Sequence, residues 1–407
     1  MPMSNLSYCP LPPRDQDIYR FRSRYSINLG PIFLHGPTSP DTPNTSELET
    51  LQTTIKTTTL DTTTQKYQTH WQTCPPSTTT LLHLRDTLHY NTLHLPLSFL
   101  TLGPLFSQGT PFEGGPAQVY TRCWSAVKHF IERCHTVGIG VLLDFDLAAN
   151  GVDLGASAER RALARDCVAF VVQEVRFHAL GGVVGVRVSR SSEGDAGEQR
   201  RAGEMASSGL GDWEREVRMI VRAIDEFLPL HINCTSSSNS SSSGSGGTPE
   251  QWFRHCSETP LQRLEQLQIH NPDHSAPSFL LLSPDEIRTK AQQARIERPQ
   301  LLREILMRAE AAEAQAASKK PKLWNSPAGR QSFVHGWDVG FSDALRFFDA
   351  AVERLLPARR TGADKIGEVD LWARRRTRDV ERLEEDCRAW ELGLRRGIAD
   401  FDRFVGN

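Results

Sequence analysis

The stretch VYTRCWSAVKHFIERCHTVGIGVLLDFD, residues 119–146, decides the fold class. Its first part carries apolar residues at intervals of three and four, which is the period of an amphipathic helix. Gly138 and Gly140 end that helix, and VLLDFD (141–146) follows as a continuous apolar run. A helix that leads directly into a fully apolar strand is typical of a parallel sheet, whose strands are buried on both faces. The stretch therefore predicts one helix–strand unit of an α/β fold.

The same alternation of helix and apolar strand extends in both directions along the chain. No Gly-rich phosphate-binding loop follows any of the predicted strands, so the pattern favours a (β/α) barrel over a doubly wound nucleotide-binding sheet. A full barrel needs eight strands, and no further unit follows residue 233, so we predict an incomplete (β/α)8 TIM-barrel-like domain with a helical C-terminal extension. The predicted strands are 27–33, 91–96, 141–146, 181–188 and 228–233, and the predicted helices are 81–90, 119–136, 162–178 and 213–227.

Composition divides the chain into five segments. Residues 37–80 are rich in Thr and poor in large apolar side chains, which predicts a loop or a disordered segment. Residues 235–247 form a Ser/Gly tract of the kind found in flexible linkers. The segments are an N-terminal arm with the first strand (1–36), the Thr-rich segment (37–80), the partial barrel (81–233), a Ser/Gly-rich linker with an irregular region (234–283) and a helical C-terminal region (284–407).

Charge and cysteine usage exclude several classes of protein. The 47 Lys and Arg residues against 49 Asp and Glu residues give a formal charge of −2, which argues against a nucleic-acid partner. No apolar run approaches the roughly 18–20 residues that span a bilayer, and no apolar signal core begins the sequence. The eight cysteines are scattered without a CxxC pair, which indicates free thiols in a reducing compartment, and hence a cytoplasmic protein with no metal and no cofactor.

Several stretches resemble a known family of fungal proteins. FRSRYSINLGPIFLHGP (21–37), residues 83–146 and GGVVGVRV (181–188) resemble successive strands, helices and loops of fungal glycoside hydrolase family 5 proteins of the exo-β-1,3-glucanase or β-glucosidase type. FVHGWDVGFSDALRFF (333–348) and other C-terminal stretches are similar to the helical extension of an intracellular branch of that family. The resemblance covers about two thirds of the chain and implies a barrel with a retaining mechanism, which uses one acid/base Glu and one nucleophilic Glu.

The resemblance also implies where the chemistry should lie, and those positions are altered. The family's Arg on the second strand falls at His94, and its His after the third strand falls at Asp146. The family's Asn–Glu pair after the fourth strand falls at Arg190 and Ser191, and a serine hydroxyl is no general acid near neutral pH. SFLLLSPDEI (278–287) resembles the segment that follows the whole barrel, so the strand that carries the nucleophile is expected to be missing.

These changes predict a glycosidase-like protein without activity, which retains at most weak binding of a β-glucoside or glucan. One alternative is a residual hydrolase that uses substitute carboxylates, since Asp144, Asp146 and Glu193 follow or end predicted strands, where barrel enzymes hold their catalytic groups. Another is an interaction protein that acts through its C-terminal helices (285–405). An open five-stranded sheet also predicts self-association through its exposed edge.

Other conspicuous side chains fit structural roles better than functional ones. Glu174 is predicted to be a surface or helix-contact charge, and the arginines of residues 374–378 are predicted to lie on a solvated helix face of mixed charge. Four aromatic residues at helical spacing are expected in a core rather than in a sugar-binding platform, namely Trp337, Phe341, Phe347 and Phe348.

Overall fold

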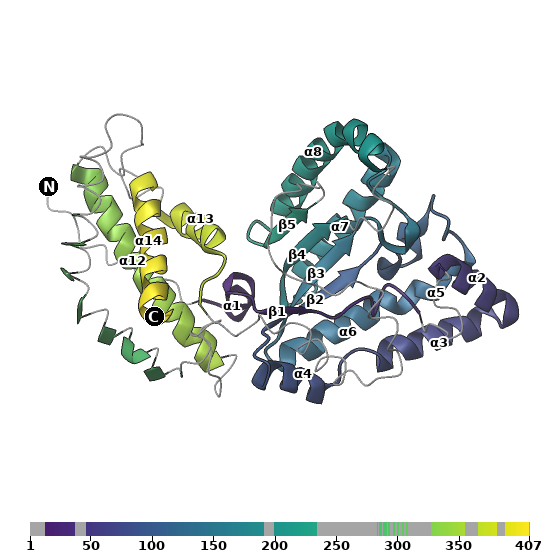
Figure 1. Ribbon diagram of the computed structural model, residues 1–407, viewed down its shortest axis with the longest axis horizontal. Coiled ribbons are helices and arrows are strands. Elements are labelled where there is room, and N and C mark those ends of the chain that lie inside the picture. The colour runs from purple at the N-terminus through teal and green to yellow at the C-terminus, as the bar shows by residue number, and fades with distance from the viewer. Residues whose placement is uncertain are drawn as a thin grey trace. The chain divides into compact units, whose positions relative to one another are not determined.

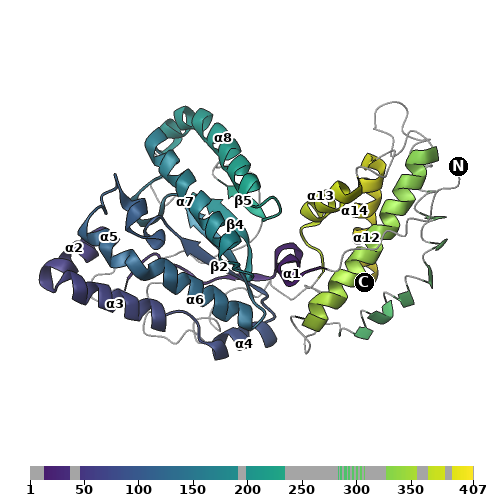
Figure 2. The same cartoon turned by 180° about the vertical axis from the view of Figure 1, so that it is seen from behind.

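The computed structural model describes residues 13–36, 46–190, 199–233, 327–354, 365–380 and 387–406, together with scattered positions between 283 and 307 (Figures 1 and 2). The chain forms two compact units. One unit comprises Met1–Arg24 and Ser275–Asn407, and the other comprises Tyr25–His274. The N-terminal segment therefore groups with the C-terminal helices and not, as the sequence predicts, with the first strand.

A parallel sheet of five strands forms the centre of the unit Tyr25–His274. The strands lie side by side in chain order, and every neighbouring pair is parallel. This confirms the mixed α/β class and is compatible with part of a barrel; within the described residues the sheet does not close. The strands are β1 (Ser26–Asn28), β2 (Thr92–Leu97), β3 (Gly140–Asp146), β4 (Val183–Ser189) and β5 (Leu230–Asn233).

The first strand is much shorter than predicted. It ends at Asn28, because Gly30 takes a positive φ of 72° and the backbone then turns through residues 31–35. Asn28 holds this turn in place, since its side-chain oxygen accepts a hydrogen bond from the Gly30 backbone N–H at 2.8 Å. The apolar side chains of residues 32–34 therefore pack from a loop and not from a strand.

The helices predicted for this unit are present. The helix expected from residue 119 begins a turn later, because residues 115–122 form two shorter helical pieces. The long helices are α4 (Thr78–Asp86), α6 (Cys123–Thr136), α7 (Ala158–Phe177) and α8 (Gln199–Ile224), and the short ones are η1 (Leu100–Leu102), η2 (Pro104–Ser107), α5 (Gly115–Val119), η3 (Tyr120–Arg122) and η4 (Ala149–Gly151).

One face of the sheet is apolar and forms the core with the helices. Alternate residues of the three central strands are fully buried, and they belong to the same hydrophobic cluster as the inner faces of α6, α7 and α8. Burying each such side chain contributes about 1.5–3 kcal/mol, so this face holds the unit together. The strand residues are Leu93, Leu95, Leu97, Val141, Leu143, Phe145, Val186 and Val188.

The Thr-rich segment is helical, so the prediction of a loop or disorder was wrong for residues 47–73. It forms α2 (Glu47–Thr57) and α3 (Leu60–Thr73). Ser46 and Thr59 cap these helices, each accepting a hydrogen bond from a backbone N–H of the first turn. Leu51, Tyr67 and Trp71 are at most 2% exposed. A few large side chains in the right register thus anchor two helices that are otherwise polar.

The other unit is helical. It contains α1 (Asp15–Phe21), α12 (Pro327–Arg354), α13 (Val369–Val380) and α14 (Cys387–Gly406), and the described positions from 285 to 307 are helical as well. Figures 1 and 2 show α12 and α14 side by side. The four aromatic residues singled out in α12 are all buried in the core of this unit, as expected for their spacing. None of the described helices in either unit is long and apolar enough to cross a membrane.

Four glycines bring the backbones of α12 and α14 into direct contact. A Cβ added at Gly336 would lie 2.0 Å from the Trp390 carbonyl oxygen, and one at Gly340 would lie 2.1 Å from the Leu394 carbonyl oxygen. Gly393 and Gly397 of α14 are equally tight against the carbonyl oxygens of residues 333 and 337. Residue 336 contacts residue 390, and residue 340, one turn later on α12, contacts residue 394, one turn later on α14. The two helices therefore run parallel. Each helix thus carries a small-xxx-small pair, which permits close backbone approach.

A buried ion pair connects two helices of this unit, and a partly buried one joins α14 to the segment before α13. Arg376 of α13 is 1% exposed, and its Nε lies 2.7 Å from the Asp343 carboxylate of α12. The expected solvated face is therefore wrong for this arginine, whose partner is far away in the sequence. Burial raises the pKa of Asp343, and the Arg376 charge counteracts that shift. Burial likewise raises the pKa of Asp402 to about 6, although Lys365 lies 3.4 Å from its carboxylate.

The N-terminal segment is bonded to residues 365–367. The Ser23 N–H donates to the Lys365 carbonyl at 2.7 Å, and the Gly367 N–H donates to the Phe21 carbonyl at 2.7 Å. Between these bonds an antiparallel bridge joins Arg22 to Ile366. The backbone of the N-terminal segment is therefore an integral part of the helical unit.

Candidate functional site

The second face of the sheet carries polar side chains across all five strands. The strand register pairs Asn28 with His94, Asp144 with Arg187, and Arg187 with His231. Side chains of paired residues point to the same face, and residues two apart on one strand do so too, so these five residues share one face. Four of them are partly or fully exposed and Asp144 is buried. This polar face is the candidate site.

Asp144 lies at the centre of the polar face and is only 9% exposed. Its Oδ1 accepts a hydrogen bond from the Ser189 hydroxyl at 2.9 Å, and its Oδ2 lies 3.8 Å from an Arg187 guanidinium nitrogen. Burial raises the pKa of the Asp144 carboxyl; Arg187 and Ser189 oppose this shift, and the nearby Asp146 adds to it. Asp144 is therefore a carboxyl group whose protonated form is favoured relative to an exposed aspartate.

Asp146 lies two residues further along β3, on the same face and at the carboxyl end of the strand. Its Oδ1 accepts a hydrogen bond from the Ala148 N–H at 2.9 Å, which holds the turn that follows the strand. It pairs in register with Ser189 of the neighbouring strand. The structure thus brings the two predicted aspartates together with Ser189.

An unpredicted ion pair joins the end of β4 to the loop after β3. The Arg190 guanidinium bonds the Asp153 carboxylate, whose other oxygen accepts from the Gly155 N–H at 2.8 Å. The only sequence signal for this pairing is the Asp-x-Gly turn itself, which does not specify a partner 37 residues away. The two other candidates from this region, Ser191 and Glu193, lie outside the described residues.

His94 occupies the middle of β2 and is partly buried. Its carbonyl oxygen accepts a hydrogen bond from the Leu29 N–H at 3.1 Å, which fixes the end of β1 beside it. The imidazole shares the polar face with Asn28 of β1 and is separated from Asp144 by Pro96, the register partner of Asp144 on β2. His94 therefore belongs to the candidate site by position.

A buried carboxylate that no sequence pattern predicts also organises the region after β1. Glu47, at the start of α2, accepts hydrogen bonds from the hydroxyls of Tyr67 and Tyr120, each at 2.8 Å, and from the Gly36 N–H at 3.2 Å. Burial and the Glu47 charge raise the pKa of the Tyr120 hydroxyl well above its ordinary value. Both phenols therefore stay neutral and donate, and this cluster joins α2, α3 and η3 to the loop after β1.

Other predicted features have clear structural roles or lie outside the described residues. Glu174 of α7 accepts from the Trp124 indole N–H at 2.8 Å and from Lys128 at 2.9 Å, so it is a contact between helices, as expected. Within the described parts of the chain no three His, Cys, Asp or Glu side chains are grouped to hold a metal ion. Cys256 and the nearby histidines His255, His270 and His274, whose spacing does not suit zinc, lie outside the described residues.

Comparisons with known proteins point to glucosidases. A family described as glucan 1,3-beta-glucosidase 3 C-terminal domain matches residues 306–405, which include α12, α13 and α14. Glucan 1,3-beta-glucosidase 3 of Schizosaccharomyces pombe is 30% identical over 140 residues, which are 32% of this chain and 28% of that protein. The matched part thus spans less than a third of the curated relative's length. The two matches support a relationship to glucosidases of this type.

Proposed function

We propose that this chain is a glycoside hydrolase family 5-like protein that binds a β-glucoside or β-glucan on the polar face of its sheet without hydrolysing it. The observation that carries the proposal is the row of polar side chains across the five strands. Asn28, His94, His231, Arg187 and Asp144 supply both donors and acceptors for sugar hydroxyls. The relationship to a glucan 1,3-beta-glucosidase supports a glucan as the ligand.

The arrangement of the carboxylates supports binding without turnover. Retaining hydrolysis needs two carboxyl groups about 5–5.5 Å apart on opposite sides of the scissile bond. Asp144 and Asp146 are instead successive residues of one strand face, and Asp144 is bonded to Ser189 and faces Arg187. The position that the family resemblance assigns to the acid/base Glu is Ser191. These features favour a face that recognises a sugar and lacks the paired groups that cleave it.

Binding and hydrolysis are measured separately on the full chain. Calorimetric titration with laminarioligosaccharides is expected to show binding, and Arg187→Gln is expected to weaken it about tenfold because a charged donor is lost. Arg176→Gln is the matched control, since Arg176 lies exposed on α7 away from the polar face. No binding by the folded protein, or equal effects of the two substitutions, contradicts the proposal.

A residual hydrolase is the second candidate, and the environment of Asp144 favours it. A raised carboxyl pKa is what a general acid requires, and Asp146 follows on the same face. The test is release of the fluorophore from an aryl β-glucoside by the full chain and by the Asp144→Asn and Asp146→Asn variants. Turnover that both substitutions abolish, in variants with an unchanged melting temperature, establishes the hydrolase and refutes binding without turnover.

A further inference from the structure

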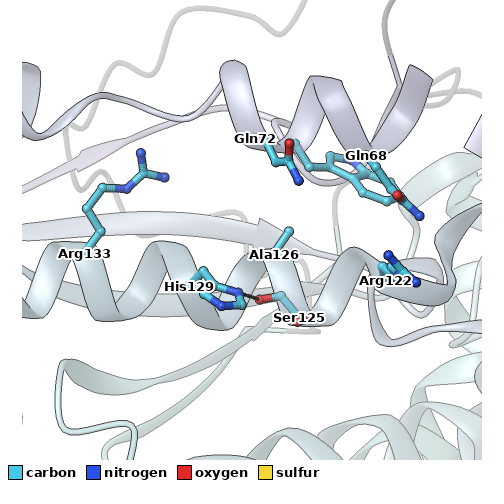
Figure 3. Close-up of a pocket in the computed structure, with 8 residues that line it drawn as sticks. Gln68, Gln72, Arg122, Ser125, Ala126, His129 and Arg133 are labelled. Atoms are coloured by element: carbon cyan, nitrogen blue, oxygen red, sulfur yellow. Dashed lines mark hydrogen bonds between the residues drawn. The ribbon is translucent and has the colours of Figure 1, made fainter. Parts of the chain in front are cut away.

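Helices α3 and α6 line an open groove with a volume of about 420 Å³, which we name the α3–α6 groove (Figure 3). This volume is within the range of small-molecule sites, about 300–1,000 Å³. The groove lies on the side of α6 that carries the exposed Ser125 and His129, whereas the opposite side of α6 is buried in the core. It is lined by Gln68, Trp71 and Gln72 of α3 and by Arg122, Ser125, Ala126, His129 and Arg133 at and along α6.

Two arginines mark the two ends of the groove. Figure 3 shows the side chains of Arg122 and Arg133 extending from the α6 side into the space below α3. They are eleven residues apart, which corresponds to about 16 Å along a helix. Among the described residues neither guanidinium has a carboxylate oxygen within 4.0 Å, and no aspartate or glutamate lines the groove. The groove therefore holds two positive charges that no described carboxylate neutralises.

The remaining lining adds donors between the two charges. Trp71 is 2% exposed and forms an apolar part of the wall, because its ring packs against the rings of Tyr67 and Tyr120. Gln68 and Gln72 extend from α3 toward α6 in Figure 3 and bring two amide groups. His129 Nδ1 donates to the Ser125 carbonyl oxygen at 2.7 Å, so this N–H is already bonded within α6 and is not available to a ligand. Two guanidinium groups with two amide groups between them, and no acidic side chain in the lining, are complementary to the oxygens of an anion.

The spacing of the charges selects the shape of the ligand. A single small anion contacts one arginine and leaves the other unneutralised, whereas a longer molecule with an acidic group at each end contacts both. We propose that the α3–α6 groove binds a small organic molecule that carries an acidic group, phosphate or carboxylate, at each end. This site is separate from the polar face of the sheet, so it is independent of the proposed glucan binding.

Calorimetric titration of the full chain tests the proposal with four probes. Fructose 1,6-bisphosphate and suberate carry acidic groups at both ends, fructose is the neutral counterpart, and inorganic phosphate is a single anion. We expect at least one of the two-ended acids to bind and fructose not to bind. Binding of inorganic phosphate as tight as that of the bisphosphate identifies a simple anion site and overturns the proposal, as does the failure of both two-ended acids to bind.

Substitutions locate the binding within the groove. Arg122→Gln and Arg133→Gln are each expected to weaken binding about tenfold, because each removes one charged hydrogen bond, while Arg176→Gln leaves it unchanged. Gln72→Glu is a second test, since it places a negative charge in the groove without removing an arginine, and Thr73→Glu is its exposed neighbour and control. Circular dichroism confirms that each variant is folded. Equal binding by Gln72→Glu and Thr73→Glu places the ligand elsewhere and refutes the proposal.

Discussion

Replacing Gly336 by Ala is the sharpest test of the packing between α12 and α14. The added Cβ would lie 2.0 Å from the Trp390 carbonyl oxygen, whereas carbon–oxygen contacts are normally about 3.3–3.6 Å. The two helices must therefore separate by at least about 1.3 Å. A gap of 0.5–1 Å already forfeits about a quarter to a half of the dispersion energy of the facing atoms, so the contacts along this interface weaken together.

The size of the effect follows from two opposing terms. Overpacking a core costs about 1–3 kcal/mol, and the upper end applies here because the obstacle is backbone and not a flexible side chain. Ala in place of Gly within a helix returns about 1 kcal/mol. We therefore expect Gly336→Ala to destabilise the helical unit by about 2 kcal/mol, which corresponds to about a thirtyfold change in the unfolding equilibrium.

Amide hydrogen exchange reports this change in each unit separately. In Gly336→Ala, exchange of the amides in α12 and α14 is expected to accelerate about thirtyfold, while exchange in β2, β3 and β4 is unchanged. Gly211→Ala in α8 is the control with the opposite sign, because a Cβ there meets nothing within 4 Å and Ala stabilises a helix by about 1 kcal/mol. Slower exchange in α12 of the Gly336 variant would refute the close backbone contact.

Three further changes test other parts of the structure. Arg376→Gln leaves the buried Asp343 without its charged partner and is expected to lower the free energy of unfolding by about 3–5 kcal/mol; a loss below about 1 kcal/mol in urea denaturation would contradict the buried ion pair. The folded protein holds the Asp402 proton up to a pKa of about 6 and the unfolded chain only to about 3.9, so the contribution of this group to stability falls by about 3 kcal/mol as pH rises from about 4 to 6; Asp402→Asn should lack this contribution, and an identical pH dependence in both proteins would count against it. Tyr120→Phe removes a buried donor to Glu47 and is expected to cost about 1–3 kcal/mol in thermal unfolding, whereas an unchanged melting temperature would show that the bond contributes nothing.

The sheet could be predicted because its strands are short apolar runs of sequence that lie between helices. VLLDFD and GGVVGVRV can be identified as strands without knowing which strands they pair with. A strand buried on both faces needs apolar residues whatever its neighbours are. The period of two along a strand also placed Asp144 and Asp146 on one face. The bond from Ser189 to Asp144 was not predictable, because it depends on the register between β3 and β4.

The Thr-rich helices were missed for a different reason. Thr has a low helix propensity, since its side chain loses freedom and competes for backbone groups. In α2 and α3 the hydroxyls instead donate to carbonyls four residues earlier, as Thr54 does to Thr50 at 2.7 Å and Thr64 does to Leu60 at 2.8 Å. Tertiary packing of Trp71 then decides the conformation. The α3–α6 groove was therefore out of reach of the sequence alone, since one of its walls was predicted to be unstructured.

The bonding of Phe21, Arg22 and Ser23 to residues 365–367 sets an order of events during synthesis. These partners are separated by roughly 340 residues of chain, which a ribosome adds in about 17–70 s at about 5–20 residues per second. The strands β1 to β5 are all synthesised within that interval, so the unit that contains the sheet can fold first. During this time the apolar side chain of Phe21 lacks the contact with Trp372 that it makes in the folded protein. The apolar side chain of Phe21 thus stays without its folded partner until translation has passed α13.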